Sequence, residues 1–222
     1  MKINADLERR ALVFSEEIPW VDSPLKGVQR RMLERDGEEV ARATSIVRYA
    51  PNSHFSSHTH GGGEEFLVLD GVFSDERGNY GAGSYVRNPA GSRHTPYSKN
   101  GCTIFVKLRQ MKPEDQRYVS IDTKKVVWQS GVVNGLKLKH LHSFDTEQVA
   151  LEKWEPGTQF SNRTHFGGEE IFVVEGVLKD ESGIYPKGTW LRNPPLSVHS
   201  PFSDSGCVIY TKVGHLGAAV CT

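Results

Sequence analysis

The chain has 222 residues, of which 27 are Lys or Arg and 27 are Asp or Glu, so its formal net charge is zero. This balance gives no electrostatic basis for a nucleic-acid partner or an anionic membrane surface. The sequence has no long apolar run that would span a bilayer, and residues 1–20 lack the apolar core of a signal peptide. We therefore expect a cytoplasmic protein with no nucleic acid and no membrane among its partners.

In chain order, the first candidate element is residues 6–14, whose pattern fits either a helix or a strand. After it come short segments rich in β-branched and aromatic residues, each bounded by Gly, Pro, Asn or Asp. In the first half these predicted strands are residues 43–49, 65–69, 83–87 and 103–108. Residues 109–117 are polar and contain a proline, which indicates a linker. In the second half the predicted strands are residues 149–154, 170–174, 189–192 and 208–213. The pattern predicts an all-β sandwich or barrel.

The two halves repeat one another. Residues 48–107 align without gaps to residues 153–212, a constant shift of 105 positions (153 − 48; 212 − 107). Turn signals recur at the same places, at residues 75–78 and 180–183. A repeat of this length indicates two copies of one structural unit.

The repeat carries histidine and carboxylate side chains that suit a metal ion. In the first half they are His58, His60, Glu64 and His94. Alternation along a strand places His58 and His60 on one face, and Glu64 follows a glycine turn that brings it back towards them. Three imidazoles and one carboxylate form a mixed nitrogen and oxygen site that suits Zn, Fe, Mn, Ni or Cu. The sequence therefore predicts a divalent metal in the first half.

The second half keeps His165, Glu169 and His199 but has Arg163 where the first half has His58. Two alternatives follow. The three remaining residues hold a metal as a facial triad, or the Arg163 guanidinium replaces the metal charge and pairs with Glu169. We expect one divalent metal per chain, or two under the first alternative.

The spacing of these residues resembles the two motifs of the cupin family. His58, His60, Glu64 and Gly71 match the first motif, and the second is matched by Gly83, Pro89, Gly91 and His94. Residues 58–71 and 85–89 are similar to the ChrR-type cupin, the metal-binding domain of the ChrR anti-sigma factors. The resemblance implies two tandem cupin (jelly-roll) β-barrels, at residues 1–112, including an N-terminal extension, and at residues 113–222. It also implies zinc as the favoured metal, with Fe, Mn and Ni as alternatives.

Two functions follow from this resemblance. One is a metal-dependent regulatory or sensor protein, and the other is a non-haem metal-dependent dioxygenase that acts on a small diketone or phenolic ketone. ChrR anti-sigma factors bind their sigma factor through an N-terminal zinc domain with a His-x3-Cys-x2-Cys signature. The first hundred residues here contain no cysteine, so a sigma-factor partner is not expected by that route. A small-molecule ligand or substrate is the expected partner, a homodimer is compatible with the sequence, and no catalytic residue is assigned.

The remaining singled-out residues have simpler interpretations. Cys102 and Cys207 occupy equivalent positions and are expected as small core residues. We expect His54 and His215 to be solvated, and the pair His140 and His142 to mark a strand face. Glu65 and Glu170 either orient the preceding glutamate, face a partner, or are exposed. The recurring segments 87–89 and 192–194, both Arg-Asn-Pro, suggest a shared turn or interface.

Overall fold

The computed structural model describes residues 1–217, which form β-strands and two short 3-10 helices. These residues divide into two compact units. Unit 1 contains Met1–Ala5 and Ile18–Val126, and unit 2 contains Asp6–Glu17 and the described residues from Val127 onward. No helix within residues 1–217 combines the length and apolar character needed to cross a membrane.

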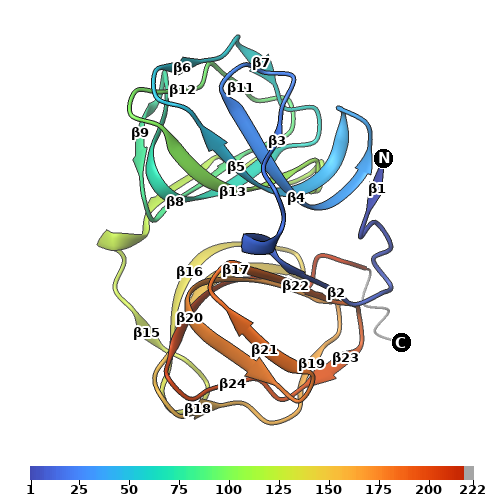
Figure 1. Ribbon diagram of the computed structural model, residues 1–222. Coiled ribbons are helices and arrows are strands. Elements are labelled where there is room, and N and C mark those ends of the chain that lie inside the picture. Colours follow the sequence, from blue (N-terminus) through green and yellow to red (C-terminus); the bar gives the residue numbers. More distant parts are fainter. Residues whose placement is uncertain (218–222) are drawn as a thin grey trace. The chain divides into compact units, whose positions relative to one another are not determined.

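The strands of unit 1 follow the chain from β1 to β14, without β2 (Figure 1). They are β1 (Lys2–Ile3), β3 (Val21–Asp22), β4 (Val28–Gly37), β5 (Ala41–Tyr49), β6 (Ser53–His54), β7 (His58–Thr59), β8 (Glu64–Asp75), β9 (Gly78–Gly81), β10 (Ser84–Asn88), β11 (Arg93–His94), β12 (Tyr97–Ser98), β13 (Cys102–Leu108) and β14 (Val119–Asp122). The 3-10 helix η2 (Thr123–Lys125) follows β14.

The strands of unit 2 repeat this series. They are β2 (Ala11–Phe14), β15 (Gln129–Ser130), β16 (Leu136–Phe144), β17 (Glu147–Trp154), β18 (Thr158–Gln159), β19 (Arg163–His165), β20 (Glu169–Asp180), β21 (Gly183–Pro186), β22 (Thr189–Asn193), β23 (Ser197–His199), β24 (Phe202–Ser203) and β25 (Cys207–Val213). The 3-10 helix η1 (Ser15–Glu17) follows β2.

Each unit is built on an antiparallel sheet, and from the second strand onward the two sheets have equivalent strand orders. In unit 1 the order is β1-β4-β5-β13-β8-β10-β14, and in unit 2 it is β15-β16-β17-β25-β20-β22-β2. A second, shorter layer closes each barrel, with β9 and β12 pairing with the far end of β8, and β21 and β24 pairing with β20. The predicted all-β fold with two tandem jelly-roll barrels is confirmed.

Alternate side chains of the central strands fill the barrel interiors. In unit 1 the buried cluster includes Phe66, Val68 and Ile104, and in unit 2 it includes Ile171 and Val173. Each long strand must also bend to enter both layers. At Gly71 the backbone has φ +72°, and an added Cβ would lie 2.2 Å from the carbonyl oxygen of Gly101, so no side chain fits at this bend.

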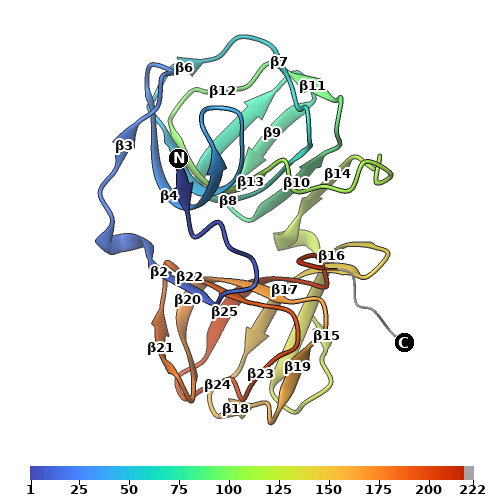
Figure 2. The same ribbon diagram turned by 90° about the vertical axis from the view of Figure 1, so that its right-hand side faces the viewer.

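Strands β2 and β14, which lie outside the two aligned repeats, each complete a sheet formed by the other half of the sequence. β2 pairs with β22, with Val13 opposite Trp190, and β14 pairs with β10, with Ile121 opposite Tyr85. Figure 1 shows this as a blue strand beside orange β22, and Figure 2 shows β14 beside β10. The two units therefore differ from the predicted ranges 1–112 and 113–222 in two segments, which carry these exchanged strands.

This exchange generates a prediction about fragments. Residues 1–112 lack β14 and carry β2 without its partner strand, so we expect this fragment alone to aggregate or self-associate through unpaired edges. Co-expression with residues 113–222 is expected to give a soluble 1:1 complex by size-exclusion chromatography with light scattering. The matched control is residues 18–126, which include β14 and lack β2, and which should be more soluble than residues 1–112. Two stable monomers from the 1–112 and 113–222 fragments would contradict the prediction.

Candidate metal centres

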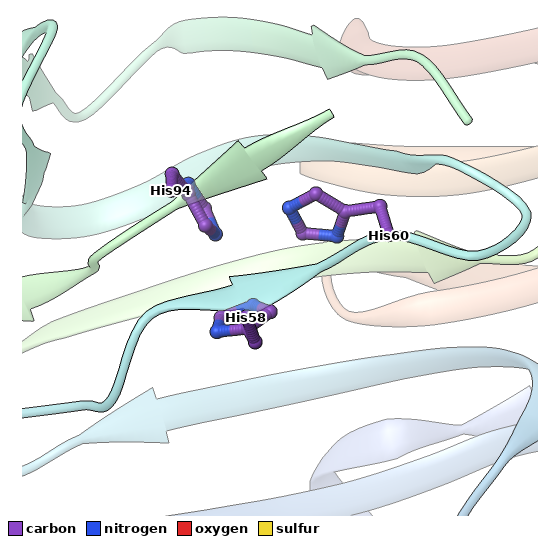
Figure 3. A group of neighbouring side chains, drawn as sticks. All are labelled: His58, His60 and His94. Atoms are coloured by element: carbon purple, nitrogen blue, oxygen red, sulfur yellow. The ribbon is translucent and has the colours of Figure 1, made fainter. Parts of the chain in front are cut away.

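Three histidines from two neighbouring strands of unit 1 face one another (Figure 3). His58 lies on β7 and His94 on β11, directly opposite each other in the pairing of these strands, and His60 follows β7. Their ring centroids are 4.6 to 5.0 Å apart. One nitrogen of each ring lies within 4.8 Å of the others, so the three could hold a metal ion. His60 and His94 are buried, whereas His58 is exposed.

Glu64 lies beside this group at the start of β8. Its Oε2 is 3.6 Å from Nε2 of His60 and 3.7 Å from Nε2 of His94. Both of these buried nitrogens lack a hydrogen-bond partner among the described residues. Donor atoms bound to one metal at about 2.1 Å in a tetrahedral arrangement lie about 3.4 Å apart. The separations and the unpartnered nitrogens therefore fit a metal held by His60, Glu64 and His94, with His58 on the exposed side.

Neighbouring polar groups fix the orientation of these side chains. Asp75 Oδ2 lies 3.2 Å from Nδ1 of His94, and the Asn88 amide donates to Oε2 of Glu64 at 2.9 Å. A carboxylate on the far nitrogen leaves Nε2 of His94 to face the site. Burial lowers the pKa of His60. Burial also opposes charge on His94, but its hydrogen bond with Asp75 and the charge of Glu64 raise the His94 pKa.

A cavity of about 480 Å³ adjoins the histidines of unit 1. Its polar wall includes His58, His60 and Glu64. Its apolar wall includes Val28, Val47, Tyr49, Phe55, Val106 and Leu108. This volume lies in the range of cavities that bind small organic molecules. A metal at the histidines would therefore have an apolar pocket beside it.

Unit 2 brings its three predicted residues together on β19, β20 and β23. His165, Glu169 and His199 form a second group that could hold a metal. Glu169 Oε2 lies 3.3 Å from Nε2 of His165 and 3.2 Å from Nε2 of His199. The two imidazole nitrogens are themselves only 3.0 Å apart. They are thus close enough to share a hydrogen bond, unlike the unpartnered nitrogens of unit 1.

Arg163 pairs with a carboxylate that the sequence did not single out. Its guanidinium donates to both oxygens of Glu152, at 3.0 and 3.3 Å, while Oε1 of Glu169 is 3.9 Å away. Trp154 Nε1 also donates to Glu152, at 3.1 Å. The expected pairing of Arg163 with Glu169 is therefore the longer of two contacts. Under the repeat shift, Glu152 and Trp154 replace Val47 and Tyr49, which line the cavity of unit 1.

The two imidazoles that make this 3.0 Å contact have opposite pKa shifts. Burial lowers the pKa of His165 to about 4. Burial also opposes charge on His199, but hydrogen bonds with Asp180 and Glu169 raise its pKa to about 9. In the metal-free protein these shifts favour a protonated His199 beside a neutral His165 at neutral pH. The His199 ring lies between two carboxylates, with Asp180 at Nδ1 and Glu169 at Nε2.

Other predicted residues have mixed outcomes. Cys102 and Cys207 are buried free thiols, as expected of small core residues, and Cys221 lies outside the described residues. His54 is exposed and stacks on Tyr97. The expectation for His215 was wrong, because its Nε2 lies 2.6 Å from Oε2 of buried Glu170.

The exposed alternative for Glu65 and Glu170 is also wrong, because both are buried. Glu65 accepts a hydrogen bond of 2.6 Å from Arg87, whose guanidinium also binds Asp115. Sequence reasoning missed the supporting residues altogether. Asn88 and Asn193 hold the two glutamates, and Asp75 and Asp180 hold the second-motif histidines. The recurrence of these four residues in both repeats is the signal that could have identified them. The sequence pattern indicated only turns or an interface at these positions.

The opposite pKa shifts in unit 2 generate a prediction for the metal-free protein. His199 stabilises the fold fully below about pH 6.5, and this contribution is lost as pH rises through about 9. The lowered pKa of His165 has the opposite effect on stability. The fold is not destabilised by this residue above about pH 6.5, and it loses stability as pH falls from 6.5 towards 4. NMR titration with a chelator present should find His199 charged and His165 neutral at pH 7.5.

The matched control is Asp180→Asn, which should lower the His199 pKa towards its ordinary value because the hydrogen-bonded carboxylate charge is removed. Titration of both imidazoles together near pH 6.5 in the unsubstituted protein would contradict the assignment.

Comparison with known proteins identifies the family. The model of the ChrR cupin-like domain matches residues 8–112 and again residues 116–217. No curated protein matches the chain. The fold is similar to that of a candidate dioxygenase from Nostoc punctiforme, at 17% identity and a TM-score of 0.80, over 97% of this chain and 86% of that chain.

Two further structures share the fold. One is a bacterial pirin from Escherichia coli in complex with nickel(II), at 15% identity and a TM-score of 0.68, over 92% of this chain and 98% of that chain. The other is an oxalate decarboxylase from Lactobacillus farciminis in a formate complex, at 11% identity and a TM-score of 0.68, over 93% and 86% of the two chains. Both matched ranges together cover nearly all of the sequence, and the chain belongs to the ChrR cupin-like family, whose domain it carries twice.

Proposed function

We propose that unit 1 binds one divalent metal through His58, His60, Glu64 and His94, and that the metal and the adjoining cavity form a site for a small organic molecule. The observation that carries this proposal is the pair of buried, unpartnered Nε2 atoms of His60 and His94 beside a cavity of about 480 Å³. Leaving two such nitrogens without partners is unfavourable unless an ion or ligand takes them up.

The reaction class that this arrangement supports best is that of a non-haem metal-dependent oxygenase acting on a small diketone or phenolic ketone. When bound, the metal would supply Lewis-acid and redox chemistry, for which mixed imidazole and carboxylate donors are suitable. His58 lies on the solvent-exposed side of the group, so a substrate has access to the site. Asn88 holds Glu64 in place, and the apolar wall around Phe55 excludes water from a bound molecule. The fold-level likeness to a candidate dioxygenase is consistent with this class.

A regulatory or sensor function is the second candidate, and membership of the ChrR cupin-like family favours it. Such a protein needs a metal site whose ligand state changes the binding of a partner. Zinc would be the favoured metal in that case, since it holds its ligands without redox chemistry. The two candidates share the same site and differ in turnover.

The deciding experiment is metal analysis of protein made without an affinity tag, followed by oxygen-consumption assays with diketones and phenolic ketones. Iron with oxygen consumption would support the oxygenase. Tightly held zinc with no turnover would support the regulatory candidate. Absence of a stoichiometric divalent metal after reconstitution with each of Zn, Fe, Mn and Ni would overturn both.

A first substitution tests the ligand set. His60→Ala is expected to reduce metal affinity by at least about tenfold, because removal of one ligand leaves a coordination shell that the others do not restore. Competition against a chromophoric chelator measures this change. His54→Ala is the matched control, since His54 is an exposed histidine that stacks on Tyr97. Full metal content in the His60→Ala protein would refute the ligand assignment.

A second test converts unit 2 to the pattern of unit 1. Arg163→His together with Glu152→Val gives unit 2 the residue types that unit 1 has at the equivalent positions, His58 and Val47. We expect the metal content to rise from one towards two ions per chain. Arg163→His alone leaves Glu152 buried without its cation, which we expect to cost about 3 kcal/mol of stability. Mass spectrometry of bound metal and thermal unfolding measure the two effects. Two metals per chain in the unsubstituted protein would instead show that unit 2 already binds one.

A further inference from the structure

Arg109 lies at the cavity of unit 1, immediately after β13. It is exposed overall and lines the cavity together with Gly61 and Leu108. Its guanidinium folds across the glycine turn that follows His60. A Cβ placed on Gly61 would come within 2.8 Å of Nη2 and 3.3 Å of Cζ of Arg109, so a side chain at Gly61 would displace the guanidinium. The absence of a side chain on Gly61 thus allows a cation to lie next to the metal-site residues.

The backbone of Arg109 adopts a conformation that side chains disfavour. Its φ is +57°, and its repeat counterpart Gly214 has φ +76°. Both make the same turn contact, from Arg109 N to Gly63 O and from Gly214 N to Gly168 O, each at 3.0 Å. Unit 2 thus uses glycine, the residue that this conformation favours, while unit 1 keeps an arginine there. Unit 1 thus keeps a side chain beside the candidate site in a backbone conformation that disfavours one.

The charge of Arg109 is available to a ligand. Among the described residues, no hydrogen bond or ion pair engages its guanidinium. The other arginine that lines the cavity is Arg30, and it donates to both oxygens of Glu39 at 3.2 and 3.3 Å. Arg109 is therefore the cavity arginine whose donors remain free for a bound molecule.

We propose that Arg109 binds the carboxylate of an organic acid whose apolar body fills the cavity and whose oxygen donors reach the site at His58, His60 and His94. This inference rests on the proposed metal centre and names its substrate class. A guanidinium presents paired donors in the geometry that a carboxylate accepts. Val47, Phe55 and Leu108 provide the apolar surface for the body of the acid. Unit 2 has Gly214 at the equivalent position, so the acid-binding site belongs to unit 1.

The test uses two ligands that differ at one group. Benzoylpyruvate is a diketone with a terminal carboxylate, and benzoylacetone carries a methyl group in its place. Binding to the full-length, zinc-loaded protein is measured by isothermal titration calorimetry, with no oxygen consumption involved. We expect benzoylpyruvate to bind at least about tenfold more tightly, as one charge-assisted pair at a partly exposed site would give.

Substitution of Arg109 identifies the source of this preference. Arg109→Gly, which introduces the residue of unit 2 and suits the backbone, should abolish the preference for benzoylpyruvate while zinc content and benzoylacetone affinity stay unchanged. Arg109→Lys should retain part of it, because the charge remains without the paired donors. Lys26→Gln removes an exposed positive charge from the same unit and is the matched control, with no change expected.

The outcomes separate this inference from the proposed metal centre. Equal affinity for the two ligands, or a preference that persists in Arg109→Gly, overturns the carboxylate site while leaving the metal centre intact. Failure of the unsubstituted protein to hold any of Zn, Fe, Mn and Ni overturns the metal centre. In that case the two ligands are compared on the metal-free chain. A preference for benzoylpyruvate that depends on Arg109 still supports the carboxylate site, and the absence of this preference overturns the carboxylate site.

Discussion

Burial of imidazole nitrogens beside a carboxylate is the constraint around which both barrels are arranged. Such an atom loses its contacts with water, at a cost of about 1–3 kcal/mol when nothing replaces them. Unit 1 places two of these atoms, on His60 and His94, within 3.7 Å of one carboxylate oxygen. The rest of the barrel keeps them there. Asp75 and Asn88 prevent His94 and Glu64 from turning away, and the pairing of β7 with β11 brings the imidazoles together. The site is thus preorganised to receive positive charge.

Unit 2 meets the same constraint with charges of its own. In the metal-free chain the raised pKa of His199 favours a cation between Asp180 and Glu169, and Arg163 supplies a second beside Glu152. The changes relative to unit 1 form a consistent set, because an arginine at the His58 position needs a buried carboxylate at the Val47 position. Trp154 then occupies the position of Tyr49 and donates to that carboxylate. One barrel architecture therefore carries two groups that could hold a metal, and a buried pair of Arg163 and Glu152 lies beside the group in unit 2.

Much of this arrangement was predictable from the sequence. The repeat, the short strands and the motif spacing predicted two all-β barrels and the convergence of His58, His60 and His94, because these features depend on local pattern. The Glu152 partner of Arg163 was not predictable, since a glutamate within a strand carries no positional signal until the neighbouring strand is known. The same holds for Arg109, which belongs by composition to a polar linker but lies at the cavity because its backbone pairs with the glycine turn at Gly63. Residues 6–14 were a candidate strand, but the pairing of β2 with β22 was not predictable because the two are far apart in the sequence, and β14 was not predicted.

The exchange of strands also sets an order of events as the chain is synthesised. β14 follows β10 closely, so the sheet of unit 1 has all its strands once residue 122 has emerged. The sheet of unit 2 is different, because its edge strand β2 is made near the beginning and its partner β22 near the end. Throughout elongation β2 has no strand to pair with, and closing so long a loop carries an additional entropic cost. Unit 2 therefore completes its sheet only after unit 1 has done so, and the brevity of β2, four residues, limits the unpaired edge that the growing chain presents to other chains.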